Sequence, residues 1–415
     1  MSRYAELHCH TNFSFLDGAS HPEDLVQRAI DLGYDALAVT DHDGFYGISR
    51  VWQAARATGL GVIYGVEIAL ETDPEGPVDP VSVAEERDRR RHARAKGGQG
   101  RLRRGRSVRA HGVKPTDLPE SDHLVLLSGS PDGYRALSHL VTKAQMRGEK
   151  DHPIYTWDDL ATAAANGDIH ALTGCRHGAV PKATTDGLAA TIREASRLRE
   201  IFGTRLHLEM WHHGMPEDDL RNDLMWEVGQ KLGLSTVATN QVHYHDRSDA
   251  YLSEVLAAIG GRRTLSEADG FRPASDERYL KHPKEMEWRF SRYPGVVARS
   301  AELGRRLAFD LALVAPRLPD FPMPGHFRDE MDYLRHITWE GARDVYPGSD
   351  DGVDPVARRR IEHELDVIER LGFPGYFLVV KDLVDFAKDQ GIFCQIRGSG
   401  ADSAVCRCIG LTRVD

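Results

Sequence analysis

Two histidines near the start of the chain have the spacing of paired metal ligands. His8 and His10 lie at the end of a short apolar run, Ala5–Cys9, of the kind that forms buried strands. Residues two apart on a β-strand point to the same side, so both imidazoles can reach one metal ion. The sequence therefore predicts a metal site at the end of this first strand.

Further potential ligands follow the later apolar runs. Asp17 lies in the next loop, and four more candidates come after the second, third, fifth and seventh runs: His42, Glu67, Cys175 and His243. Loops at the carboxyl ends of βα units converge on one face of a barrel, so these side chains are expected to meet. Any one of them could be an ordinary core or surface residue. Their recurrence at successive strand ends favours a site for Zn²⁺, Mn²⁺ or Fe²⁺.

Seven apolar runs, each followed by a helix-like pattern, organise the first 260 residues. They are Ala5–Cys9, Ala36–Thr40, Val62–Val66, Leu124–Leu127, Ile169–Thr173, Leu206–Met210 and Thr236–Thr239. Repeated strand–helix units predict an α/β fold with a parallel sheet. Helix starts support this interpretation, because Pro22 precedes two acids and Thr156 precedes Asp159 by three residues.

Composition narrows the class of protein. A chain of 415 residues suggests two or three domains, and five cysteines are too few for a disulfide framework. No stretch approaches the roughly 18 apolar residues of a membrane span, and the N-terminus lacks the apolar core of a signal peptide. We therefore expect a cytoplasmic protein with no membrane contact. The net charge of −10 does not exclude a nucleic-acid partner, because local patches decide such binding.

One segment interrupts the strand–helix pattern. Residues 72–122 are rich in arginine and glycine, and within them residues 85–114 hold 12 Lys and Arg against three Asp and Glu. We expect an exposed, disordered insertion between the third and fourth strands. A solvated loop explains this composition most simply. A contact with DNA phosphates is the alternative, and its affinity would fall steeply with salt.

The chain changes character from about residue 279. Residues 279–345 have helical patterns, and the spacing predicts further helices over 358–371 and over about 379–390. A short strand is expected at 392–395. It runs into a turn at Arg397, Gly398, Ser399 and Gly400, which precedes a helix from about residue 401.

This turn could hold a phosphate group. Backbone N–H groups at a turn before a helix can surround an anion, and Arg397 and Ser399 add side-chain donors. An ordinary tight turn explains the Gly-Ser-Gly pattern equally well. The turn alone is therefore weak support for a nucleotide site.

Several motifs in the first part of the chain resemble the PHP (polymerase and histidinol phosphatase) domain. They are His8-x-His10, Thr40-Asp41-His42, Gly65-x-Glu67, His123-Leu124, Thr173-Gly174-Cys175 and Ala238-Thr239-Asn240-x-x-His243-Tyr244. They are most similar to the version at the N-terminus of bacterial C-family DNA polymerases, the DNA polymerase III alpha-subunit group. The resemblance implies a distorted (β/α)7 barrel with up to three metal ions. The ligands that it implies are His8, His10, Asp17, His42, Glu67, His123, Cys175 and His243.

At two positions, the comparison with this family adds to or departs from what the strand pattern indicates. His123 precedes its apolar run, so only the resemblance indicates it as a ligand. The family has an aspartate two residues before the last histidine, and this chain has Gln241 there. An amide carbonyl can contact a metal ion but supplies no charge. We therefore expect this position to hold a divalent ion less well than the family's aspartate does, which would weaken hydrolysis.

The end of the chain resembles the start of the palm domain of the same polymerases. The similar segments are 372–378 and 395–406, and the resemblance implies that Arg397, Gly398 and Ser399 bind the triphosphate of the incoming nucleotide. The family usually has glycine where this chain has Ile396, which would be strained at a positive φ. The implied domains are a PHP barrel over 1–275 and an incomplete α+β palm segment over 276–415.

The forms of the palm motif and of the last barrel motif are most similar to the error-prone branch of the family. The first hypothesis is therefore the N-terminal part of an error-prone DNA polymerase, which makes DNA from dNTPs with Mg²⁺ and tolerates template damage. DNA, dNTPs and other replication or repair proteins are the implied partners. The family's catalytic acids come later, and residues 391–415 hold no matching carboxylate pair, so this chain is not expected to polymerise DNA. The alternatives are a stand-alone metal-dependent phosphoesterase and a non-catalytic scaffold that metals stabilise.

Overall fold

The computed structural model of the chain forms two compact units, Met1–Val314 and Ala315–Asp415. The residues that it describes are 3–71, 121–149, 152–314, 320–348 and 352–414. Nearly all of the predicted insertion at 72–122, including its basic part at 85–114, lies outside the described residues. Within the described ranges, no helix is both long enough and apolar enough to span a bilayer.

Seven strands form one sheet in the first unit, in the order of the chain. They are β1 (Ala5–Glu6), β2 (Ala36–Val39), β3 (Gly61–Glu71), β4 (Ser121–Ser128), β5 (Ile169–Leu172), β6 (Leu206–Met210) and β7 (Ser235–Ala238). Each strand overlaps one of the seven predicted apolar runs. The sequence prediction of an α/β barrel-like fold is therefore confirmed.

The expectation of an all-parallel sheet is wrong at one strand. β4 runs antiparallel to both β3 and β5, whereas the other neighbouring strands pair in parallel. An antiparallel pair needs no helical crossover between its strands. Because β4 is reversed, its first residues lie at the edge where the preceding strands end.

The sheet is curled, and its two outer strands meet just beyond their ends. Cys9 and Val242 form an isolated parallel bridge. His10 donates a backbone hydrogen bond of 2.8 Å to Val242, and Val242 donates one of 2.9 Å to His8. These contacts bring the segments after β1 and β7 together at the edge that carries the candidate ligands.

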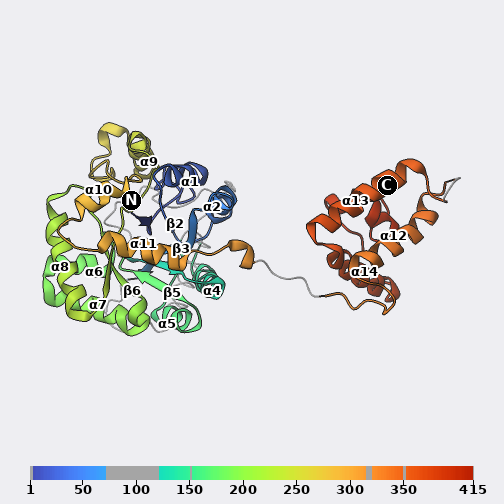
Figure 1. Ribbon diagram of the computed structural model, residues 1–415, viewed down its shortest axis with the longest axis horizontal. Helices are drawn as coiled ribbons and strands as arrows, with labels where there is room; N and C mark the ends of the chain where they lie inside the picture. Colours follow the sequence, from blue (N-terminus) through green and yellow to red (C-terminus); the bar gives the residue numbers. More distant parts are fainter. Residues whose placement is uncertain (1–2, 72–120, 150–151, 315–319, 349–351, 415) are drawn as a thin grey trace, which may run out of the picture. The chain divides into compact units, whose positions relative to one another are not determined.

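Helices surround the curled sheet (Figure 1). They are α1 (Pro22–Asp31), α2 (Ile48–Ala55), α4 (Pro131–Arg147), α5 (Trp157–Asn166), α6 (Ala179–Ala183), α7 (Leu188–Phe202), α8 (Pro216–Leu232), α9 (Ala250–Gly261), α10 (Pro283–Arg289) and α11 (Val296–Leu307). The predicted starts are confirmed: α1 begins at Pro22, and Thr156 caps α5 by accepting from the Asp159 N–H at 3.2 Å.

The first unit extends further than the predicted boundary at residue 275. α11 packs against β1, β2, β3 and β7. Leu303 and Leu307 of this helix join a core cluster with β-strand residues such as Ala5 and Leu127. Ser300 accepts from the backbone N–H of Ala238 at 2.9 Å and donates to its carbonyl at 2.7 Å. Residues 276–314 therefore belong with the barrel, because α11 supplies part of its core.

Helices are the only regular secondary structure among the described residues of the second unit. Its longer helices are α12 (Glu330–Val345), α13 (Pro355–Leu371) and α14 (Pro374–Asp389), and a 3-10 turn at Ser399–Asp402 precedes α15 (Ala404–Cys408). The predicted helix over 358–371 is confirmed, and Gly372 ends it in the left-handed conformation at φ 70°. The strand expected at 392–395 is absent, because no extended segment among the described residues of this unit pairs with it.

Candidate metal centre

Most of the predicted ligands gather at one edge of the sheet. His8 and His10 follow β1, His42 follows β2, and Glu67 lies in β3, where it forms a parallel bridge with His42. His123 lies near the start of β4, opposite Ala69 of β3. The reversal of β4 brings His123 to this edge, which explains why the positions of the apolar runs did not predict it.

Glu67 lies at the centre of this group. Its Oε2 atom is 3.0 Å from His10 Nε2 and 3.5 Å from both His8 Nε2 and His42 Nδ1. Its Oε1 atom is 3.1 Å from His123 Nδ1. Only 1% of the Glu67 side chain is exposed, so its charge is screened by these four imidazoles rather than by water.

Asp17 links three of the histidines on the outer side of the group. Its Oδ2 atom is 2.7 Å from His10 Nδ1 and 3.3 Å from His42 Nε2. Its Oδ1 atom is 3.2 Å from His243 Nδ1. Asp17 and Glu67 together therefore contact every imidazole of the predicted ligand set.

These side chains offer three overlapping sets of ligand atoms. The sets are His8–His10–Glu67, His10–Asp17–His42 and His42–Glu67–His123, and the atoms within each set lie within 4.8 Å of one another. Imidazole nitrogens and carboxylate oxygens suit Zn²⁺, Mn²⁺ and Fe²⁺. The residues present therefore fit a divalent metal centre in which Glu67 belongs to two sets.

The pKa values reflect this concentration of charge. Burial alone would raise the pKa of Glu67, but the imidazoles, His123 first, hold it well below its usual range. Burial opposes protonation of His8, yet Glu209 and Glu67 raise its pKa well above the ordinary value. Burial and the nearby His10 lower the pKa of His42 to about 4. Glu67 therefore stays charged near neutral pH, as a metal-ligating carboxylate must.

Two buried carboxylates behind the histidines were missed by the sequence analysis. Glu209 of β6 accepts at Oε1 from His8 Nδ1 at 2.7 Å and from the Thr239 hydroxyl at 2.6 Å. Glu6 of β1 accepts from the Tyr4 hydroxyl at 2.7 Å and from the Asn240 N–H at 3.0 Å. Burial raises the pKa of Glu6 to about 7. A glutamate between two apolar residues of a short strand segment was the available sequence signal for both.

Cys175 and His243 lie beside the centre but belong to none of the three sets. Cys175 Sγ is 3.4 Å from His123 Nδ1. His243 contacts Asp17 through Nδ1 and accepts at Nε2 from the Arg278 guanidinium at 3.1 Å. Gln241 is buried at a positive φ of 46°, and its Nε2 atom has no hydrogen-bond partner among the described residues.

The predicted phosphate turn lies in the second unit. Arg397 and Gly398 are exposed, and Gly398 has the positive φ of 82°. Ile396 is not among the residues with positive φ, so the strain considered for it does not arise. Binding of a nucleotide by Arg397, Gly398 and Ser399 stays a prediction.

The helix after this turn is held by a residue that the sequence analysis did not identify. Glu364 of α13 accepts from the Ser403 hydroxyl at 2.7 Å and from the N–H groups of Ala404 and Val405 at 3.1 and 3.0 Å. Burial would raise the pKa of Glu364, but these donors lower it. Glu364 thus fixes the first turn of α15 against α13.

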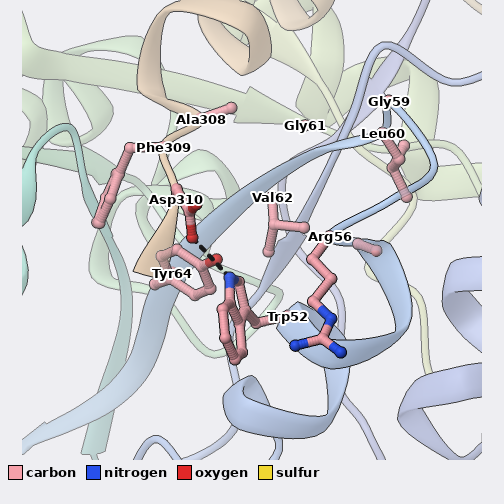
Figure 2. Close-up of a pocket in the computed structure, with 11 residues that line it drawn as sticks. Trp52, Arg56, Gly59, Leu60, Gly61, Val62, Tyr64, Ala308, Phe309 and Asp310 are labelled. Carbon is pink, nitrogen blue, oxygen red and sulfur yellow. Dashed lines mark hydrogen bonds between the residues drawn. The ribbon is translucent and has the colours of Figure 1, made fainter. Parts of the chain in front are cut away.

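The first unit also has a pocket that none of the candidate ligands lines. Its volume is about 280 Å³, and α2, the start of β3 and the segment after α11 form its walls (Figure 2). Trp52 donates to Asp310 across it at 2.7 Å. The remaining lining residues are Ala55, Arg56, Gly59, Leu60, Gly61, Val62, Tyr64, Ala308 and Phe309. It carries no cluster of catalytic groups.

Two protein families match the chain in succession. The PHP domain family matches residues 6–213, about half of the chain, and the bacterial DNA polymerase III alpha NTPase domain matches residues 332–415. The two matches therefore cover parts of both compact units.

Curated relatives match almost the entire chain. The error-prone DNA polymerase of Nocardia farcinica is 42% identical over 99% of this chain, and that of Cutibacterium acnes is 40% identical over 99%. The chain covers 36% and 33% of these relatives, so it spans about a third of their length. Among solved structures, an amidohydrolase from Chromobacterium violaceum is 18% identical with a TM-score of 0.28, over 58% of this chain and 87% of that one.

Proposed function

We propose that this chain, which belongs to the PHP domain family, forms the N-terminal third of an error-prone DNA polymerase. Identity of 40–42% with relatives of that name over 99% of the chain carries this proposal. The PHP match precedes the polymerase match along the chain, as in the first sequence hypothesis. The complete protein would act in the cytoplasm on primed DNA and dNTPs, together with other replication or repair proteins.

In the complete protein, the second unit would contribute to the nucleotide site. Arg397, Gly398 and Ser399 would contact the triphosphate, and acids outside this chain would hold Mg²⁺ for nucleotidyl transfer. The exposure of Arg397 and Gly398 leaves them accessible to such a ligand. The basic segment at 85–114 is a candidate contact for DNA phosphates, outside the described residues.

The polymerase proposal is tested by primer extension with the complete natural protein. We expect Mg²⁺-dependent extension, including past an abasic template site. Arg397→Ala should raise KM for dNTP, whereas Arg305→Ala on α11 should leave it unchanged. Failure of the complete protein to extend any primer would contradict the proposal.

We further propose that the barrel holds divalent metal ions. The ligands are His8, His10, Asp17, His42, Glu67 and His123, with Cys175 beside His123. Zn²⁺, Mn²⁺ and Fe²⁺ fit this donor set. When bound, such ions can activate water and stabilise the oxygens of a phosphoester displacement. Glu209 would orient His8 by accepting its Nδ1 proton, which leaves Nε2 free for the metal.

Hydrolysis of phosphoesters by the barrel is a second candidate function. The membership of Glu67 in two ligand sets favours it, because Glu67 would then help to hold two ions, and a pair of ions can stabilise the oxygens of a phosphoester displacement. The alternative is a metal-stabilised scaffold without activity. The hydrolase and the scaffold both predict metal binding, but only the hydrolase predicts turnover of a phosphoester substrate.

Assays on this chain alone, without the rest of the polymerase, separate the two roles of the barrel. Metal-free protein is loaded with Mn²⁺ or Zn²⁺ and assayed on p-nitrophenyl phosphate and on 3′-labelled DNA. A hydrolase loses activity in Glu67→Gln but keeps it in Glu200→Gln, an exposed control on α7. A scaffold shows no activity in any variant, while metal raises Tm in the Glu200→Gln control but not in Glu67→Gln.

A further inference from the structure

We propose that the Arg278 guanidinium takes the place of a metal ion at His243, so that His243 is not a metal ligand in this chain. The inference rests on the proposed metal centre. It departs from the PHP resemblance, which implies up to three ions with His243 as a ligand. Four observations around His243 support it.

Both ring nitrogens of His243 are already engaged. Nδ1 lies 3.2 Å from Asp17 Oδ1, and Nε2 accepts from Arg278 Nη1 at 3.1 Å. An ion bound at Nε2 would lie about 2 Å from that nitrogen, along the same lone pair that accepts from Arg278. The metal and the guanidinium therefore exclude each other at this nitrogen.

The position of Arg278 is fixed by its backbone. Its carbonyl accepts from the N–H groups of His243 and Tyr244 at 2.9 and 3.3 Å. Asn240 donates from its side chain to the carbonyls on either side, those of Glu277 and Tyr279, at 2.6 and 2.8 Å. The guanidinium therefore starts from a backbone held against the segment that carries His243.

A residue close to His243 in the chain lacks the charge that the PHP pattern has at its position. Gln241 stands where the PHP pattern has aspartate, and its buried Nε2 atom has no partner among the described residues. A neutral amide does not offset the charge of a divalent ion. A guanidinium, which is always protonated, supplies one positive charge in place of the ion without needing that carboxylate.

The neighbouring groups fit a neutral His243 that does not bind metal. A neutral ring can donate from Nδ1 to Asp17 and accept at Nε2 from Arg278, which matches both observed contacts. None of the three ligand sets among the described residues includes His243.

The test counts metal ions per chain. Metal-free protein is saturated with Mn²⁺, freed of excess ion, and analysed by mass spectrometry for manganese. We expect one more ion per chain in the double variant Gln241→Asp/Arg278→Met than in the natural chain. Arg305→Met, which removes an arginine on α11, is the matched control and should equal the natural chain.

A second variant keeps the inference testable if the double variant does not fold. His243→Ala should retain the metal content and Mn²⁺ affinity of the natural chain, whereas His123→Ala should lose one ion. Loss of an ion in His243→Ala, or no gain in a folded double variant, would each overturn the inference. Absence of all metal would instead contradict the proposed metal centre.

Discussion

Replacement of Glu209 gives a sharp test of how the barrel holds its metal. Glu209 belongs to none of the three ligand sets among the described residues. Its Oε1 atom nevertheless accepts a hydrogen bond from His8 Nδ1 at 2.7 Å and so fixes the orientation of that ring. Such outer hydrogen bonds to ligating histidines contribute about 10–100-fold to metal affinity. This factor corresponds to about 1.4–2.7 kcal/mol.

Two variants separate the charge of Glu209 from its hydrogen bond. Oε1 accepts from both His8 and Thr239, whereas the buried Oε2 has no partner among the described residues. Glu209→Gln can therefore keep the accepting oxygen and lose only the charge, with an expected loss near 10-fold. Glu209→Ala also removes the acceptor, and we expect its loss to approach 100-fold.

The assay measures the Kd for Mn²⁺ and the Tm of the metal-free and metal-loaded protein. At a fixed free metal concentration, the gap between the two Tm values should shrink by about 3–10 °C in Glu209→Ala. Glu200→Gln on the surface of α7 should change neither quantity. An unchanged Kd in a folded Glu209→Ala protein would refute the orienting role.

Further predictions concern packing, the second unit, pH and metal removal. Gly304→Ala should lower barrel stability by about 1–3 kcal/mol in urea unfolding, because the new Cβ would lie 2.4 Å from Ala5 Cβ. Glu364→Gln should speed hydrogen exchange in α15 by weakening three hydrogen bonds, at about 1–2 kcal/mol, and unchanged exchange would contradict this. Burial lowers the pKa of His170 to about 4 and of His207 to about 3, below the unfolded value. The free energy of unfolding should therefore be independent of these two histidines above about pH 6.5. As pH falls below that value, it should decrease by up to about 1.4 kcal/mol per pH unit for each histidine. In urea unfolding at several pH values, His207→Phe should make this decrease less steep. Chelation should lower Tm, and ion restored at about 100 times Kd should return about 2.7 kcal/mol.

The strand ends could be predicted from the sequence because apolar runs and the residues that follow them are local signals. His8, His10, His42 and Glu67 follow this pattern, and the structure brings them together. His123 does not follow it, because strand direction depends on pairing with distant residues. The reversal of β4, set by its register with β3, is invisible in a run of apolar residues.

The remaining differences between the sequence predictions and the structure also come from tertiary contacts. The pattern of α11 shows an apolar face but not that this face completes the barrel core, so the boundary was placed too early. Glu6 and Glu209 lie in strands whose burial is complete, and only their partners reveal a role. Residues 392–395 have strand-forming side chains but no described neighbour to pair with.

The pairing of β3 with β4 also determines how well the barrel can tolerate insertions and deletions between these two strands. Glu71, the last residue of β3, pairs with Ser121, the first residue of β4, so the two ends of the connection at 72–120 are fixed side by side. The entropic cost of closing a loop rises only slowly with the length of the loop, by about 0.6 kcal/mol for each doubling. Residues can therefore be gained or lost at this point with little effect on the barrel, and a short turn or an entire added module would be tolerated there.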